Sequence, residues 1–282
     1  PDNLFPGISN ITGQLKRPRF LPVVSSVVLA HALIKRSDGE INGFIIEGPT
    51  AGGHNAPPRG ALQLDSNSEP IYGIKDLVDL EKIKALGRPF WLAGGYGHPQ
   101  KLKEAIDLGA QGIQVGTAFS LCNESGMESV LKQKVLHKVI AGSIKVITSS
   151  TISPTGFPFK VLGVEGTASD EKVYSDRKRI CDLGFLRNVV IDPNGNLNYR
   201  CSAEPVEDFV RKGGREEDAA GRTCLCNNLA ATAGFAQIRP GNFTEPQLVT
   251  SGDDLETITR LIKPGKNSYS AVDVIDYLLG KS

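Results

Sequence analysis

The chain has 282 residues and a formal net charge of +1, with 40% hydrophobic and 22% charged residues, which are ordinary values for a folded globular protein. A near-neutral charge argues against nucleic-acid binding or attachment to a membrane surface, both of which favour a basic patch. No apolar run approaches the roughly 20 residues of a membrane span. Five cysteines in a chain this long do not resemble a secreted disulfide scaffold, so we predict a cytoplasmic protein.

Short apolar runs alternate with amphipathic stretches over the first 150 residues. The apolar runs predict strands at 20–26, 41–48, 88–95, 112–119 and 143–149. The amphipathic stretches predict helices at 27–40, 74–86, 99–110 and 124–142. Continuous apolar strands that alternate with helices are typical of a parallel sheet covered by helices. The sequence therefore predicts an α/β protein of the (β/α) TIM-barrel type.

The second part of the chain is less regular. Beyond residue 150, Gly, Pro, Asn and Arg accumulate, and only residues 204–214, 224–235 and 271–280 have a helical pattern. We therefore divide the chain into a barrel-type domain, residues 1–162, and a mainly helical or irregular extension, residues 163–282, that wraps the barrel.

Glycine follows three successive predicted strands. These glycines are Gly48, the pair Gly94-Gly95, and Gly116 with Thr117 after it. In a βα barrel the active site lies at the carboxyl ends of the strands, and the last loops commonly bind a phosphate. Glycine allows the close approach of the backbone that such an anion site needs. We therefore predict phosphate binding at the second and third of these strand ends.

The segment Glu47–Gly60, "EGPTAGGHNAPPRG", is the most unusual loop in the sequence. Its pair Gly52-Gly53 leaves room for a flat group against the backbone, and His54 then places one titratable ring beside it. A neutral imidazole could remove a proton from a carbon acid there. Glu47 could orient His54 or pair with Arg59, or form a plain salt bridge.

Together with that loop, "WLAGGYGHPQKLKEAIDLGAQGIQVGTAF" and "SSTISPTGFPFKV" resemble the nitronate monooxygenase family, formerly called 2-nitropropane dioxygenases, whose members are FMN-dependent TIM barrels. The resemblance runs from about residue 20 to 162. It implies FMN against Gly52 and Gly53, with its phosphate held by Gly94, Gly95, Gly116 and Thr117. It also implies that His54 is the base, and that alkyl nitronates are oxidised by O₂ to a carbonyl compound and nitrite.

The sequence departs from this family at its beginning. The first βα units of the family's barrel have no counterpart, so the chain resembles the second half of the barrel plus an extension found in a longer bacterial subgroup. A half-barrel leaves open strand edges, which invite pairing with another chain. We therefore expect an open edge or an exposed apolar face at residues 20–26, completed by a further N-terminal segment or by a partner.

Two other functions fit the same motifs. One is a flavin-dependent enoyl-thioester reductase, which would use NAD(P)H. The other is a non-catalytic half-barrel that binds a phosphate ligand or flavin and completes a partner.

The cysteines raise a separate question, that of a metal site. Four of them fall in the last 102 residues of the chain: Cys181, Cys201, Cys224 and Cys226. Zinc sites usually contain pairs of cysteines separated by two to four residues, and only one Cys-x-Cys pair is present. We therefore expect buried free thiols and no metal.

Overall fold

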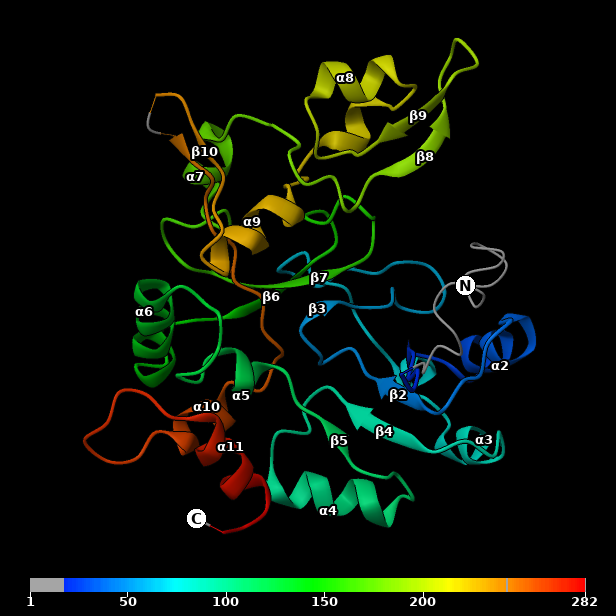
Figure 1. Ribbon diagram of the computed structural model, residues 1–282, viewed down its shortest axis with the longest axis vertical. Helices are drawn as coiled ribbons and strands as arrows, with labels where there is room; N and C mark the ends of the chain where they lie inside the picture. The colour runs from blue at the N-terminus through cyan, green and yellow to red at the C-terminus, as the bar shows by residue number, and fades with distance from the viewer. Residues whose placement is uncertain (1–17, 242, 282) are drawn as a thin grey trace, which may run out of the picture.

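The computed structural model describes residues 18–241 and 243–281 (Figure 1). Its N-terminal part is a four-stranded parallel sheet in the order β1-β2-β4-β5. These strands are β1 (Val23–Val24), β2 (Phe44–Glu47), β4 (Phe90–Ala93) and β5 (Ile113–Gln114). The predicted α/β class with a parallel sheet is confirmed.

Helices cover one face of this sheet. They are α2 (Val27–Arg36), α3 (Leu80–Lys84) and α4 (Pro99–Asp107), on the outer side of the strands in Figure 1. Side chains alternate between the faces of a strand, and Phe44 and Ile46 of β2 point toward the helices, where they pack in one core with Ile83. Ile45 and Glu47 therefore lie on the opposite face.

The helix starts follow local capping chemistry. The side chain of Ser26 caps α2, that of Asp79 caps α3, and Nδ1 of His98 accepts a hydrogen bond from the N–H of Gln100 at the start of α4. The stretch predicted as one helix at 74–86 is divided into a short 3₁₀ turn, η1 (Ile74–Asp76), and α3, because the Asp79 cap begins a new helix.

The stretch predicted as a helix at 124–142 begins later than expected. α6 spans Ser129–Ile140, because the carboxylate of Glu128 accepts hydrogen bonds from Val130 and Leu131 and so fixes the helix start. A separate short helix, α5 (Thr117–Ser120), follows β5 directly.

The predicted strand at 143–149 forms, but not in the parallel sheet. It is β6 (Val146–Ser149), which pairs antiparallel with β7 (Phe159–Leu162). The other edge of β7 pairs with β3 (Gly53–His54), so a three-stranded sheet in the order β3-β7-β6 lies beside the parallel one. Periodicity identified the strand, but not that it pairs antiparallel with the next strand in the chain, outside the parallel sheet.

The parallel sheet has two open edges within residues 18–241 and 243–281. β1 pairs there only with β2, and β5 only with β4. Close to β1, Phe20 and Val23 are 56% and 49% exposed. The expected open edge is thus present among the described strands, whereas the half-barrel interpretation stays a prediction.

The extension contains more strand than its sequence indicated. β8 (Asn188–Ile191) and β9 (Leu197–Arg200) form an antiparallel hairpin, as do the short strands β10 (Ile238–Arg239) and β11 (Phe243–Thr244). The Asn194-Gly195 pair between β8 and β9 is a strong hairpin signal that the sequence analysis did not use. Figure 1 places this hairpin at the end of the molecule farthest from α4.

The helices of the extension are short. They are α7 (Glu171–Asp176), α8 (Val206–Arg211), the 3₁₀ turn η2 (Glu216–Ala219), α9 (Leu225–Thr232), α10 (Glu256–Leu261) and α11 (Ala271–Leu278). α11 returns to pack against α4 and α5 (Figure 1). Val249, Ile258 and Val274 share a hydrophobic core with α6. None of the helices in the described ranges has the length and apolar character required to cross a lipid bilayer.

Candidate functional site

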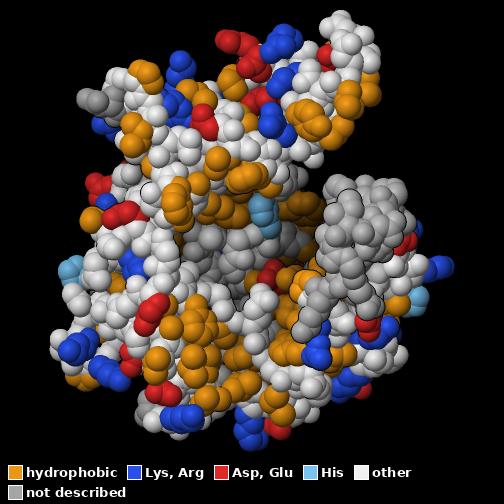
Figure 2. All heavy atoms as spheres, viewed as in Figure 1, with side chains coloured by type: hydrophobic (Ala, Val, Ile, Leu, Met, Phe, Trp, Pro, Cys, Tyr) orange, Lys and Arg blue, Asp and Glu red, His pale blue; other side chains and the backbone are white. Residues whose placement is uncertain are grey.

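A cavity of about 310 Å³ lies at the carboxyl ends of β2, β4 and β5. This face of the molecule is visibly hollowed near its centre (Figure 2). Three loops that follow strands form its walls, and a fourth wall comes from residues 250–258 of the extension. The location agrees with the general rule that parallel α/β folds place their sites at the carboxyl ends of strands.

The last residues of three neighbouring strands form a row that lines this cavity. Glu47 is paired in register with Ala93, and Ala93 with Gln114. Because neighbouring strands are about 4.8 Å apart, the carboxylate and the carboxamide start from backbone positions roughly 10 Å apart, with only the methyl group of Ala93 between them. The sequence analysis identified neither the row nor Gln114.

The six glycine and threonine residues expected to bind the cofactor all line the cavity: Gly52, Gly53, Gly94, Gly95, Gly116 and Thr117. Gly94 and Gly95 have φ angles of +86° and +72°, which favour glycine. A Cβ atom on Gly94 would also lie 3.0 Å from the backbone nitrogen of Ala51, so the close approach of these two loops depends on glycine. The structure thus brings the predicted residues together, and their role in binding a cofactor stays a prediction.

His54 occupies a different position from that expected. Gly53 lines the cavity, but His54 is not among its lining residues. The His54 Nε2 atom lies 2.7 Å from the hydroxyl of Ser153, and the ring meets that of Phe159 edge-on, with centroids 4.8 Å apart. Burial lowers the pKa of His54 from its ordinary value. The imidazole therefore stays neutral down to a lower pH than an exposed histidine would.

Residues 250–258 complete the cavity, and the sequence analysis missed them. The N–H of Gly53 donates to Oγ1 of Thr250 at 2.8 Å, and the N–H of Gly252 donates to Oγ1 of Thr117 at 2.9 Å. The two chain segments cross so closely that a Cβ atom on Gly52 would lie 2.8 Å from the Gly252 nitrogen. One signal was available: the apolar pair Leu248-Val249 also ends in small residues and a glycine.

An ion pair between a buried lysine and a partly exposed aspartate anchors this segment. Nζ of Lys160, on β7, lies 2.7 Å from a carboxylate oxygen of Asp253 and donates a 2.7 Å hydrogen bond to Thr148. The side chain of Lys160 is only 4% exposed, so the charge of Asp253 compensates an ammonium group that has little access to water. The wall at residues 250–253 is therefore fixed to the antiparallel sheet.

The cysteines of the extension are free thiols. Cys201 and Cys224 are buried and pack with Ala203 and Cys226. Across the ranges that the structure describes, no group of three or more His, Cys, Asp or Glu side chains is arranged to hold a metal ion.

Comparison with known families identifies the part of the chain that carries the parallel sheet. Residues 18–153 match the sequence model of the nitronate monooxygenase family. Residues 18–153 belong to this family. The match includes the glycine-rich loop, all four parallel strands and the glycine pairs, and it ends before β7 and the extension.

Curated relatives support this membership. A probable nitronate monooxygenase of Bacillus subtilis is 41% identical over 93 residues, which are 33% of this chain and 25% of the relative. A probable nitronate monooxygenase of Staphylococcus haemolyticus is 31% identical over 128 residues, which are 45% of this chain and 34% of the relative. The matched segments thus cover about a quarter to a third of these nitronate monooxygenase relatives.

The fold also resembles a solved structure. FabK from Thermotoga maritima superposes with a TM-score of 0.50 and 17% sequence identity, over 99% of this chain and 64% of the FabK chain. At this identity the similarity shows a shared fold. It extends beyond the nitronate monooxygenase segment into the extension.

Proposed function

We propose that this chain is part of a flavin-dependent oxidoreductase, and that its cavity holds FMN and oxidises alkyl nitronates or related carbon acids with O₂ to a carbonyl compound and nitrite. The observation that carries the proposal is the convergence of six residues. Gly52, Gly53, Gly94, Gly95, Gly116 and Thr117 follow three different strands and line one cavity in a nitronate monooxygenase segment.

The residues of the cavity fit a flavin nucleotide. The wall near β4 and β5 is glycine, and a Cβ atom on Gly116 would meet no other atom within 4 Å, which leaves space for a phosphate group. The hydroxyl group of Thr117 lies at the same cavity and can donate a hydrogen bond to a polar atom of a ligand. When bound there, FMN would supply the electron-accepting ring, while these residues bind it and limit access of water.

The chain leaves two open sheet edges within its described residues, at β1 and β5. We propose that a further N-terminal segment or a partner chain pairs with them and closes the barrel. Exposed strand edges favour such pairing. Because the chain matches only part of its relatives, the activity of the whole protein is part of this proposal.

A flavin titration tests the proposed function. We expect the purified protein to bind FMN, seen as a shifted flavin absorption band and quenched fluorescence, and to consume O₂ with a pre-formed nitronate such as ethyl nitronate. Absence of any flavin binding would favour a non-catalytic half-barrel. Anaerobic bleaching of the flavin by NADPH would favour the enoyl-thioester reductase instead.

Replacement of His54 by asparagine tests the predicted base. If His54 removes the α-proton, turnover of neutral nitroethane should fall about 100-fold, whereas that of ethyl nitronate, which needs no deprotonation, should change little. Burial lowers the pKa of His54, so the imidazole stays neutral and able to accept a proton at a pH below the ordinary histidine pKa. The part of the wild-type rate that depends on His54 should therefore be lost only at still lower pH. Equal losses with both substrates in steady-state assays would remove the role of His54 as base.

A further inference from the structure

Glu47 is the carboxylate at the end of β2, and its environment differs from that of an ordinary surface glutamate. Strand alternation directs it away from the helix-packed side chains Phe44 and Ile46 and into the cavity. It is partly buried, and within the described part of the chain no hydrogen bond or ion pair engages its carboxylate. The salt bridge to Arg59 considered from the sequence is not formed among the described ion pairs. Glu47 is therefore available for chemistry.

Glu47 also lines a second, smaller cavity of about 40 Å³ on its other side. Asn55 lines the same space and is 3% exposed. Its Nδ2 donates to the carbonyl of Ala51 at 3.0 Å, but its buried Oδ1 has no hydrogen-bond partner. Buried acceptors are normally hydrogen-bonded, and a polar cavity of this size has room for a water molecule that could donate to Oδ1. Glu47 thus stands between the main cavity and a space suited to water.

We propose that Glu47, in place of His54, is the catalytic acid–base residue that accepts the α-proton of a carbon acid bound over Ala93 and returns it to solvent through the second cavity. The inference rests on the proposed function for its substrate class. In this step the Cα–H bond breaks and its electron pair moves into the nitro group, giving the nitronate. The proton forms an O–H bond with the Glu47 carboxylate and then passes to water, so no oxidant is needed.

The charges around Glu47 are compatible with this role. Arg59, Tyr72 and Asp76 line the second cavity with it, and Tyr96 and Asp254 line the main one. Burial nevertheless raises the pKa of Glu47 from its ordinary value, which makes its carboxylate a stronger base. The Glu47-dependent rate should therefore rise as the pH rises through this elevated pKa, and then level off.

The other titratable groups that line the cavity are less suited to accept a proton. The Asp254 carboxylate accepts hydrogen bonds from the N–H and the hydroxyl of Thr257, at 3.1 and 2.6 Å, and is thus already engaged. Burial raises the pKa of Tyr96, which keeps its phenol protonated. Glu47 is the one of the three that combines a free carboxylate with a path toward water.

Exchange of the α-hydrogens of nitroethane into D₂O measures this proton transfer by itself. Followed by proton NMR without oxygen, it requires no electron transfer. We expect Glu47→Gln to lower the enzyme-catalysed exchange rate about 100-fold and to remove its pH dependence. Glu40→Gln is the matched control, because Glu40 is an exposed carboxylate shortly before the same strand. Oxidation of pre-formed ethyl nitronate should be unchanged in Glu40→Gln, and in Glu47→Gln it should fall far less than the exchange rate does.

Several outcomes would overturn the inference: no catalysed exchange by the wild-type protein, an unchanged rate in Glu47→Gln, or an equal loss in the oxidation of ethyl nitronate. Glu47→Asp keeps a carboxylate and should retain part of the exchange, and thermal unfolding checks that each variant is folded. Normal exchange without nitronate oxidation would instead contradict the proposed function and leave the role of Glu47 supported.

Discussion

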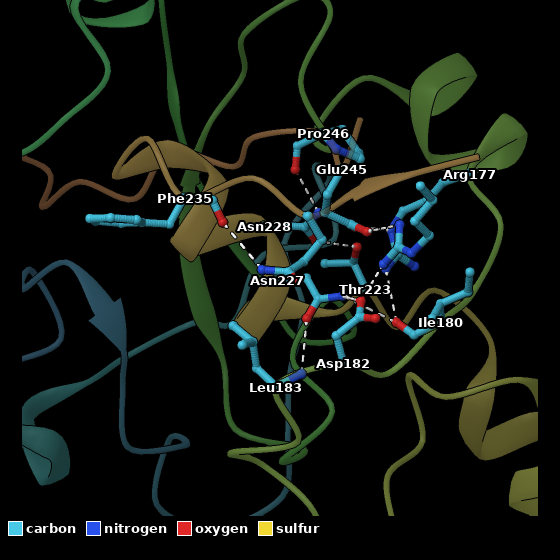
Figure 3. A network of polar contacts seen from close by, with 12 residues as sticks. Arg177, Ile180, Asp182, Leu183, Thr223, Asn227, Asn228, Phe235, Glu245 and Pro246 are labelled. Carbon is cyan, nitrogen blue, oxygen red and sulfur yellow. Dashed lines mark hydrogen bonds and ion pairs between the residues drawn. The ribbon is translucent and has the colours of Figure 1, made fainter. Parts of the chain in front are cut away.

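Replacing Glu245 with glutamine is expected to lower the free energy of unfolding by about 3–5 kcal/mol. The side chain of Glu245 is fully buried, and it lies 2.5 Å from Nε of Arg177 and 2.9 Å from Nη1 of Arg239. Asn228 donates to the same carboxylate at 3.0 Å (Figure 3). Glutamine keeps the shape but removes the charge, so Arg177 would lose its carboxylate partner and Arg239 would keep only its ion pair with Asp182.

Urea denaturation followed by circular dichroism measures this loss. Glu256→Gln is the control, because Glu256 forms an exposed ion pair with Arg260 within α10, and exposed pairs contribute little. A Glu245→Gln protein as stable as the Glu256→Gln protein would show that the buried network does not stabilise the extension. We expect the Glu245 variant also to loosen the cavity, since Asn228 bonds the backbone at Pro246 and Leu248, just before the wall residues.

Gly52→Ala is expected to weaken FMN binding about tenfold to a hundredfold, which corresponds to about 1–3 kcal/mol of overpacking. The added Cβ atom would lie 2.8 Å from both the Gly252 nitrogen and the Ser251 carbonyl carbon. Both contacts are with backbone, so no side chain can rotate away. The wall at residues 250–252 would have to move, and it would take with it the hydrogen bond between Gly252 and Thr117.

Fluorescence titration with FMN compares this variant with Gly73→Ala. Gly73 has ordinary backbone angles, and a Cβ atom there would meet nothing within 4 Å. We expect wild-type affinity for Gly73→Ala. If Gly52→Ala binds FMN equally well, then the crossing of the two segments is not part of the flavin site.

The sequence predicted those parts of the site that depend on local pattern. Apolar runs located the four parallel strands, and glycine at the ends of three of them located Gly94 and Gly116, because strands of a parallel sheet end at the same edge. The row of Glu47, Ala93 and Gln114 follows from register, which the sequence does not specify by itself. The glycine motifs were thus predictable, and the polar side chains between them were not.

Contacts distant in the sequence explain most of the remaining differences. β6 was predicted as a strand, but its antiparallel partner is chosen by packing with β7 and β3. His54 was expected to face the cavity, yet its imidazole lies beside the hydroxyl of Ser153, 99 residues further along the chain. No local pattern around His54 could indicate that partner.

The crossing of the glycine-rich loop with residues 250–252 also constrains how the protein is made. The hydrogen bond from Gly53 to Thr250 joins residues 197 positions apart, so it cannot form until residue 250 has left the ribosome. Until then the wall of the cavity that residues 250–258 provide is missing. Contacts of such long range slow folding, because a large loop must close before they stabilise anything. The cavity therefore assembles later than the parallel sheet, and a nascent chain would pass through a state in which the sheet is formed and the cavity is incomplete.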